Sequence, residues 1–184
     1  MDKYREEIMV ELKQLTKEKK VLFGIITSLQ LFSNYRYFEE KENWGDSRVL
    51  ELVIEDTYQS LHSLSFLNKQ DIYQQIERVD SITPDTEDFS TNLVSFALDA
   101  CTSVISTLLF ILDNNDEHIA DVAIYARDTV DMYIQEKDDL SLIDKDIEEY
   151  IENSQFMKIE KAKRKQLIRE ISLLNNLDFG NIQR

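Results

Sequence analysis

The sequence predicts an all-α protein, folded as a single compact bundle of about eight helices. Only one proline and three glycines occur among 184 residues, whereas β-sandwiches and doubly wound folds need many turn residues. Hydrophobic residues make up 42% of the chain, which is enough for a sizeable core. We find no internal repeat or long linker, so we expect residues 1–184 to form one domain.

The first three helices are separated by short breaks. We expect one over about residues 2–15 and a second over about 17–41, with Thr16 as the N-cap. The second helix is apolar on nearly all sides, which predicts a central position. A turn at residues 44–46 then leads to a third helix, capped by Asp46 or Ser47 and ending near residue 66.

Five further helices complete the predicted bundle. Asn68 is the expected cap of the first of them, and the Thr83-Pro84-Asp85 run ends it. They are expected over about residues 69–82, 88–113, 116–137, 143–153 and 155–175.

The stretch 93–112 is long enough to cross a membrane, and it contains a single charge, Asp99. A central carboxylate opposes insertion by about 3 kcal/mol, and acidic residues flank the stretch. We therefore predict a buried core helix and no membrane span. Asp99 lies in a stripe of small polar residues that includes Ser95, Thr102 and Ser106, which either admits a neighbouring helix or lines a cleft.

A buried carboxylate needs a partner, and Arg127 is the only basic residue between positions 79 and 136. We expect an ion pair between Arg127 and Asp99, with a role in a functional site as the alternative.

The common motifs of catalysis and cofactor binding are missing from the sequence. The two histidines, His62 and His118, lie in no zinc or di-iron pattern, and no glycine-rich phosphate loop occurs. These observations favour a protein without enzymatic activity and predict no cofactor. A single cysteine, Cys101, and no signal peptide indicate a reducing, cytoplasmic location.

Carboxylates are the one abundant functional group. A carboxylate-based metal site or enzyme is the alternative to a binding protein, built from the motif of Asp85, Glu87 and Asp88 together with Asp128 and Asp131. The competing interpretation is that the first three stabilise a helix N-terminus, while Asp128 faces solvent.

Aromatic residues cluster around the first predicted turn. Tyr35, Tyr37 and Trp44 form either a binding patch or, with Phe38, part of the core. A homodimer is a further candidate assembly, because Tyr125 and Met132 are expected on a mostly polar helix face.

The formal net charge of −15 repels phosphate backbones and anionic lipids. We therefore expect neither nucleic acid nor a membrane as a partner, although residues 158–170 are basic. A basic protein is the expected partner, and one concrete version is an immunity protein that neutralises a basic toxin.

Three stretches resemble the YjaG-like bacterial family, a family of unknown function (domain of unknown function 416). They are Asn34–Phe38 with Trp44–Asp46, Pro84–Phe89 continuing to Ala97–Ala100, and Ala126–Ile134. The resemblance covers about residues 1–166 and is less clear in the last helix. It implies an all-helical cytoplasmic protein and supplies no catalytic role.

Overall fold

A computed structural model describes residues 3–62, 67–138 and 147–174. This part of the chain contains eight α-helices and one 3₁₀ turn, with no strand, which confirms the all-α bundle. The elements are α1 (Lys3–Leu12), α2 (Lys17–Glu42), α3 (Ser47–His62), α4 (Lys69–Asp80), η1 (Thr86–Asp88), α5 (Leu93–Asp113), α6 (Asp116–Lys137), α7 (Ile147–Asn153) and α8 (Gln155–Leu173).

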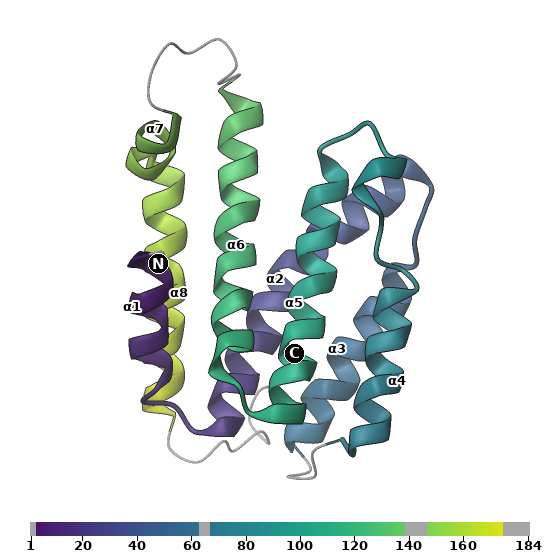
Figure 1. Cartoon of the computed structure of the whole chain (residues 1–184), viewed down its shortest axis with the longest axis vertical. Coiled ribbons are helices and arrows are strands. Elements are labelled where there is room, and N and C mark those ends of the chain that lie inside the picture. Colours follow the sequence, from purple (N-terminus) through teal and green to yellow (C-terminus); the bar gives the residue numbers. More distant parts are fainter. Residues whose placement is uncertain (1–2, 63–66, 139–146, 175–184) are drawn as a thin grey trace.

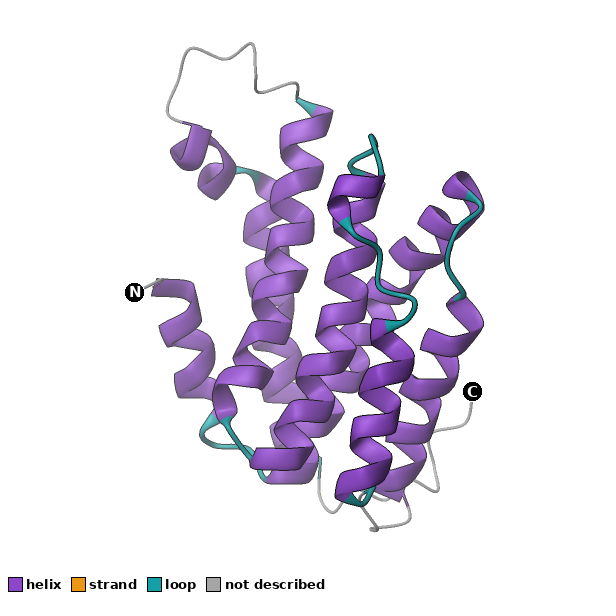
Figure 2. Cartoon of the chain, turned by 45° about the vertical axis from the view of Figure 1, so that its right-hand side comes forward, coloured by secondary structure: helices purple, strands orange, loops and turns teal. Residues whose placement is uncertain are grey.

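Helices α2 and α5 form the centre of the bundle and make its most extensive helix–helix contact. Helix α6 packs beside both of them, and α1 and α8 cover its other side (Figure 1). Helices α3 and α4 lie on the opposite flank, α3 against α2 and α4 against α5. Figure 2 shows the same arrangement from a direction turned by 45° about the vertical axis. The central position predicted for the second helix is thus confirmed.

The α2–α5 contact is close because small residues face each other across it. A Cβ atom added at Gly24 would lie 2.5 Å from Thr107 Oγ1, nearer than side chains tolerate. One turn further along α2, the Ser103 hydroxyl donates to Ser28 Oγ at 3.0 Å, and both side chains are buried. Each buried hydroxyl is therefore satisfied inside the contact, which spares it a desolvation penalty.

Several predicted boundaries are confirmed by their caps. Thr16 Oγ1 accepts from the Lys19 amide, Asn68 Oδ1 accepts from two amides of α4, and Asp46 Oδ1 accepts from the Val49 amide. Asn43 and Asn114 end α2 and α5 in the left-handed conformation. The predicted helix ends near residues 66, 143 and 175 lie outside the described residues.

Other boundaries differ from the prediction. Helix α1 ends at Leu12 and α4 at Asp80, and α5 begins at Leu93, where we expected about residue 88. The reason for the last difference is local: Asp85 caps a 3₁₀ turn by accepting from the Glu87 amide, and Phe89 then adopts an extended backbone. The partly buried Phe89 ring packs against the core, and the residue is not part of the helix.

By length and composition alone, α5 could cross a membrane. In the bundle, 67% of its most apolar window is buried against neighbouring helices.

Candidate functional site

Asp99 lies on α5 where α6 packs against it. The Thr129 hydroxyl of α6 donates to Asp99 Oδ2 at 2.8 Å, and Ser106, further along the same stripe, bonds to Tyr125. Of the two roles we considered for the stripe, it is the packing of a neighbouring helix that the structure shows. Burial raises the pKa of Asp99 to about 7, and the hydrogen bond from Thr129 offsets only part of this effect.

The expected ion pair between Asp99 and Arg127 is wrong. Arg127 instead donates to Asp128 through both Nε and Nη2, at 2.9 and 2.7 Å. The reason is helical geometry: Arg127 and Thr129 are two residues apart, so they point to nearly opposite sides of α6. Since Thr129 faces Asp99, Arg127 faces away from it.

Arg127 and Asp131 line a groove of about 700 Å³ between α1, α6, α7 and α8. The buried ring of Tyr4 also lines the groove and lies near two cations, with Lys161 Nζ 5.2 Å and Arg127 Cζ 5.9 Å from the ring centroid. Lys161 also forms an ion pair with Glu152 at 2.5 Å. Charges of both signs line the groove, and two of its cations, Arg127 and Lys161, form ion pairs with acidic groups of the chain itself.

The carboxylates of Asp85, Glu87 and Asp88 are exposed at η1, which packs against α5. Asp85 acts as a cap, which is the structural role we weighed for it, although at the 3₁₀ turn and not at α5. Among the residues that the structure describes, no three His, Cys, Asp or Glu side chains gather closely enough to hold a metal ion. The described residues therefore contain no metal site of the kind that the carboxylate alternative requires.

The single thiol is sealed in the core. Burial raises the pKa of Cys101 to about 12, so the thiol stays protonated at neutral pH. A protonated, inaccessible thiol is a poor nucleophile.

The aromatic cluster divides into buried and exposed members. Tyr35 is fully buried, donates to the Ile82 carbonyl at 2.7 Å and accepts from the Asp46 amide. Trp44 is 37% exposed and packs edge-on against Phe89, which also contacts Phe38 at 5.0 Å between ring centroids. Tyr35 is thus part of the core rather than a binding patch.

Tyr37, the third member of the proposed patch, is 51% exposed, and its ring centroid lies 5.2 Å from Lys41 Nζ.

Tyr125, which suggested a homodimer, is partly buried and packs against the main core, and Met132 is also only partly exposed. Neither residue presents the open apolar surface that the sequence suggested.

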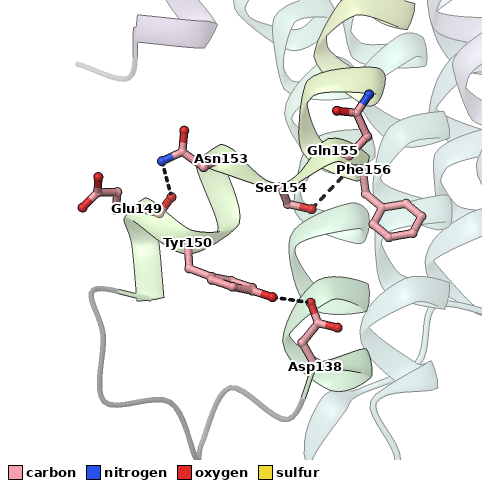
Figure 3. A pocket seen from close by; sticks show the side chains of 7 residues that line it. All are labelled: Asp138, Glu149, Tyr150, Asn153, Ser154, Gln155 and Phe156. Atoms are coloured by element: carbon pink, nitrogen blue, oxygen red, sulfur yellow. Dashed lines mark hydrogen bonds between the residues drawn. The ribbon is translucent and has the colours of Figure 1, made fainter.

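A second hollow, of about 620 Å³, lies where the end of α6 meets α7 and the start of α8. Figure 3 shows Tyr150, Asp138 and Phe156 on three sides of it, with Ser154 on the fourth. Tyr150 donates to Asp138 Oδ2 at 3.0 Å, and this hydrogen bond raises the pKa of the tyrosine. Sequence reasoning missed this site, because its residues come from three helices; the only local signal was the aromatic pair Tyr150 and Phe156 in an acidic stretch.

Charge is distributed unevenly over the bundle. Residues 39–99 contain 14 acidic and four basic side chains. Exposed carboxylates of α3, α4 and η1 form what we call the acidic side: Glu51, Glu77, Asp80, Asp85, Glu87 and Asp88. The opposite flank is held together by ion pairs between helices.

Most of these ion pairs join α8 or α1 to a neighbour. Lys165 pairs with Glu7, Arg169 with Glu11, and Arg5 with Glu117 and Asp121. The buried Arg164 pairs with Glu160 and donates to Thr27 Oγ1 of α2 at 3.0 Å. The basic character of α8 is therefore largely neutralised within the molecule.

Comparison with known proteins agrees with the fold. A crystal structure of a DUF416 family protein from Shewanella baltica OS155 superposes with a TM-score of 0.77 at 28% sequence identity, covering 89% of this chain and 83% of that one. No curated protein matches the chain. The model of the family described as "Protein of unknown function (DUF416)" matches residues 7–184, so the similarity extends through the last helix and beyond residue 166. This chain therefore belongs to the DUF416 family of proteins of unknown function.

Proposed function

We propose that this protein is a non-catalytic, cytoplasmic binding protein for a basic protein, acting as an immunity protein acts on a basic toxin. The supporting observation is the uneven charge described above: the acidic side is rich in exposed carboxylates, whereas Arg5 of α1 and most of the basic side chains of α8 are engaged in internal ion pairs. A surface of this kind attracts a basic partner over several ångströms and accelerates its capture.

The acidic side is also well placed for docking. Helices α3 and α4 form one whole flank of the bundle, away from α1, α7 and α8 (Figure 1). Their exposed carboxylates stand on helices whose inner faces are anchored by buried side chains such as Leu50, Val53 and Ile72. A rigid surface loses little conformational entropy on binding, which favours affinity.

The test compares two triple variants of equal net charge. One neutralises the acidic side (Glu77→Gln, Asp80→Asn, Asp88→Asn), and the control neutralises exposed acids elsewhere (Glu6→Gln, Glu136→Gln, Glu148→Gln). A partner is first recovered from lysate of the source cells at 50, 150 and 500 mM salt, and association rates are then measured with the purified pair. We expect the acidic-side variant to associate at least about tenfold more slowly at low salt, and the control to change less than about twofold.

Equal effects of the two variants would contradict the proposal, as would recovery of no partner at any salt concentration. Thermal melting with added Mg²⁺ or Mn²⁺ tests the carboxylate alternative in the same preparation. A metal-dependent rise in the melting temperature that the acidic-side variant abolishes would favour that alternative instead.

A further inference from the structure

The hollow between α6, α7 and α8 combines aromatic rings with acidic groups. Its lining consists of Asp138, Glu149, Tyr150, Asn153, Ser154, Gln155 and Phe156, none of which is cationic. Its volume of about 620 Å³ falls in the range typical of ligand pockets. Tyr150 is 36% exposed and Phe156 is 44% exposed, so both rings offer accessible surface.

Packing and a hydrogen bond hold the side chains around the hollow in place. Ile134, Ile151 and Met157 form a small core of their own at this end of the molecule, with Val130 packed against it. The Phe156 ring contacts the edge of Tyr133, with 5.5 Å between centroids. Tyr150 is fixed by its hydrogen bond to Asp138. The rings and the carboxylate are thus positioned before any ligand arrives, which lowers the cost of binding.

A lysine of the chain itself already contacts both an aromatic ring and a carboxylate at this hollow. Lys137 Nζ lies 5.0 Å from the centroid of the Phe156 ring and 3.3 Å from Asp138 Oδ1. One positive group is therefore stabilised by an aromatic face and a carboxylate at the same time. Lys137 is 46% exposed, so this internal contact is at the surface and open to exchange.

We propose that this hollow binds an arginine side chain of a partner protein. A planar guanidinium stacks on an aromatic face and donates paired hydrogen bonds to a carboxylate, here Asp138. Its remaining N–H groups meet acceptors on the rim, namely the Ser154 hydroxyl and the amide oxygens of Asn153 and Gln155. The site lies between α6, α7 and α8, on the flank of the bundle away from α3 and α4 (Figure 1), and does not depend on the function proposed above.

The test uses N-acetyl-arginine amide as the probe and N-acetyl-citrulline amide as its uncharged control. Each is titrated into the ¹⁵N-labelled full chain while amide shifts are followed. We expect millimolar binding of the arginine probe, with the largest shifts at Tyr150, Asn153 and Phe156. The citrulline probe should bind at least fivefold more weakly, because it lacks the charge.

Three variants sharpen the result. Asp138→Asn should weaken arginine binding at least fivefold, whereas Lys137→Gln should strengthen it about twofold to fivefold, because the competing internal cation is gone. Glu77→Gln, an exposed carboxylate on α4, is the control and should change binding less than twofold. Far-UV circular dichroism and melting temperature confirm that each variant is folded.

A general disturbance of the structure would not weaken arginine binding in Asp138→Asn and strengthen it in Lys137→Gln. Equal binding of the two probes would overturn the proposal, as would shifts confined to other parts of the chain or weaker binding by Lys137→Gln. Because the probe is a small molecule and the acidic side is tested with a protein partner, either proposal can fail while the other stands.

Discussion

At the residue scale, the most unusual group is Asp99, a carboxylate held in an apolar contact with a neutral hydroxyl as its partner. Its pKa in the folded state is about 7, against an ordinary value of 3.8. The folded protein therefore keeps the proton over a pH range in which the unfolded chain has lost it. The contribution of Asp99 to the free energy of unfolding should be fully present below about pH 4 and should be lost as the pH rises from there through 7, because the charged form is costly to bury.

Asp99→Asn keeps the shape of the side chain and removes this titration. We expect the stability of the variant relative to the parent protein to increase by about 1–3 kcal/mol between pH 5 and pH 8. Urea unfolding at both pH values, followed by circular dichroism, measures the difference. Asp88→Asn, at an exposed carboxylate of η1, is the control and should show no such pH dependence; a parallel response of the two variants would contradict the assignment to Asp99.

At the scale of elements, the closeness of α2 and α5 depends on Gly24 facing Thr107. Gly24→Ala places a methyl group 2.5 Å from Thr107 Oγ1 and should destabilise the protein by about 1–3 kcal/mol, because the two helices must separate. Thr107→Ala removes the opposing atoms, so the double variant should be more stable than Gly24→Ala alone. Urea unfolding of the four proteins completes the cycle, and additive effects would show that the two residues do not clash.

Helix α8 contains a buried ion pair, in which Arg164 is 2% exposed and Glu160 is 8% exposed, and Arg164 also donates a hydrogen bond to Thr27 of α2. Glu160→Gln leaves the guanidinium without its counter-charge and should cost about 3 kcal/mol of stability. Adding Arg164→Met removes the buried cation and should restore most of that loss. Denaturant midpoints of the single and double variants test this, and a double variant less stable than Glu160→Gln would contradict it.

At the scale of the whole molecule, two electrostatic effects oppose each other. A net charge of −15 destabilises the compact state by repulsion, while the ion pairs of α1 and α8 stabilise it. Salt screens both, but the long-range repulsion between exposed charges is screened most completely. The balance therefore favours greater stability at higher ionic strength.

We expect the melting temperature to rise by roughly 2–5 °C between 20 mM and 500 mM NaCl, measured by differential scanning calorimetry. The triple variant that neutralises Glu77, Asp80 and Asp88 should show a smaller rise. A fall in melting temperature with salt would mean that the internal ion pairs, rather than the repulsion, dominate.

The sequence by itself determined the helical class, most helix boundaries and the caps at Thr16 and Asn68, because these depend on residues near each other in the chain. It also led correctly to a core role for the apolar stretch of α5. These properties follow from hydrophobic periodicity and local hydrogen bonding, which a linear pattern records.

Tertiary structure alone decided which side chains meet. Asp99 accepts a hydrogen bond from Thr129, whereas Arg127 donates to Asp128. The two partners differ because side chains two residues apart on α6 point to nearly opposite sides of the helix. The tertiary structure also joined Tyr35 to the Ile82 carbonyl and assembled the hollow lined by Tyr150 and Phe156 from three helices. Such contacts depend on how each helix is rotated against its neighbours, and that rotation is set by the packing of the whole core.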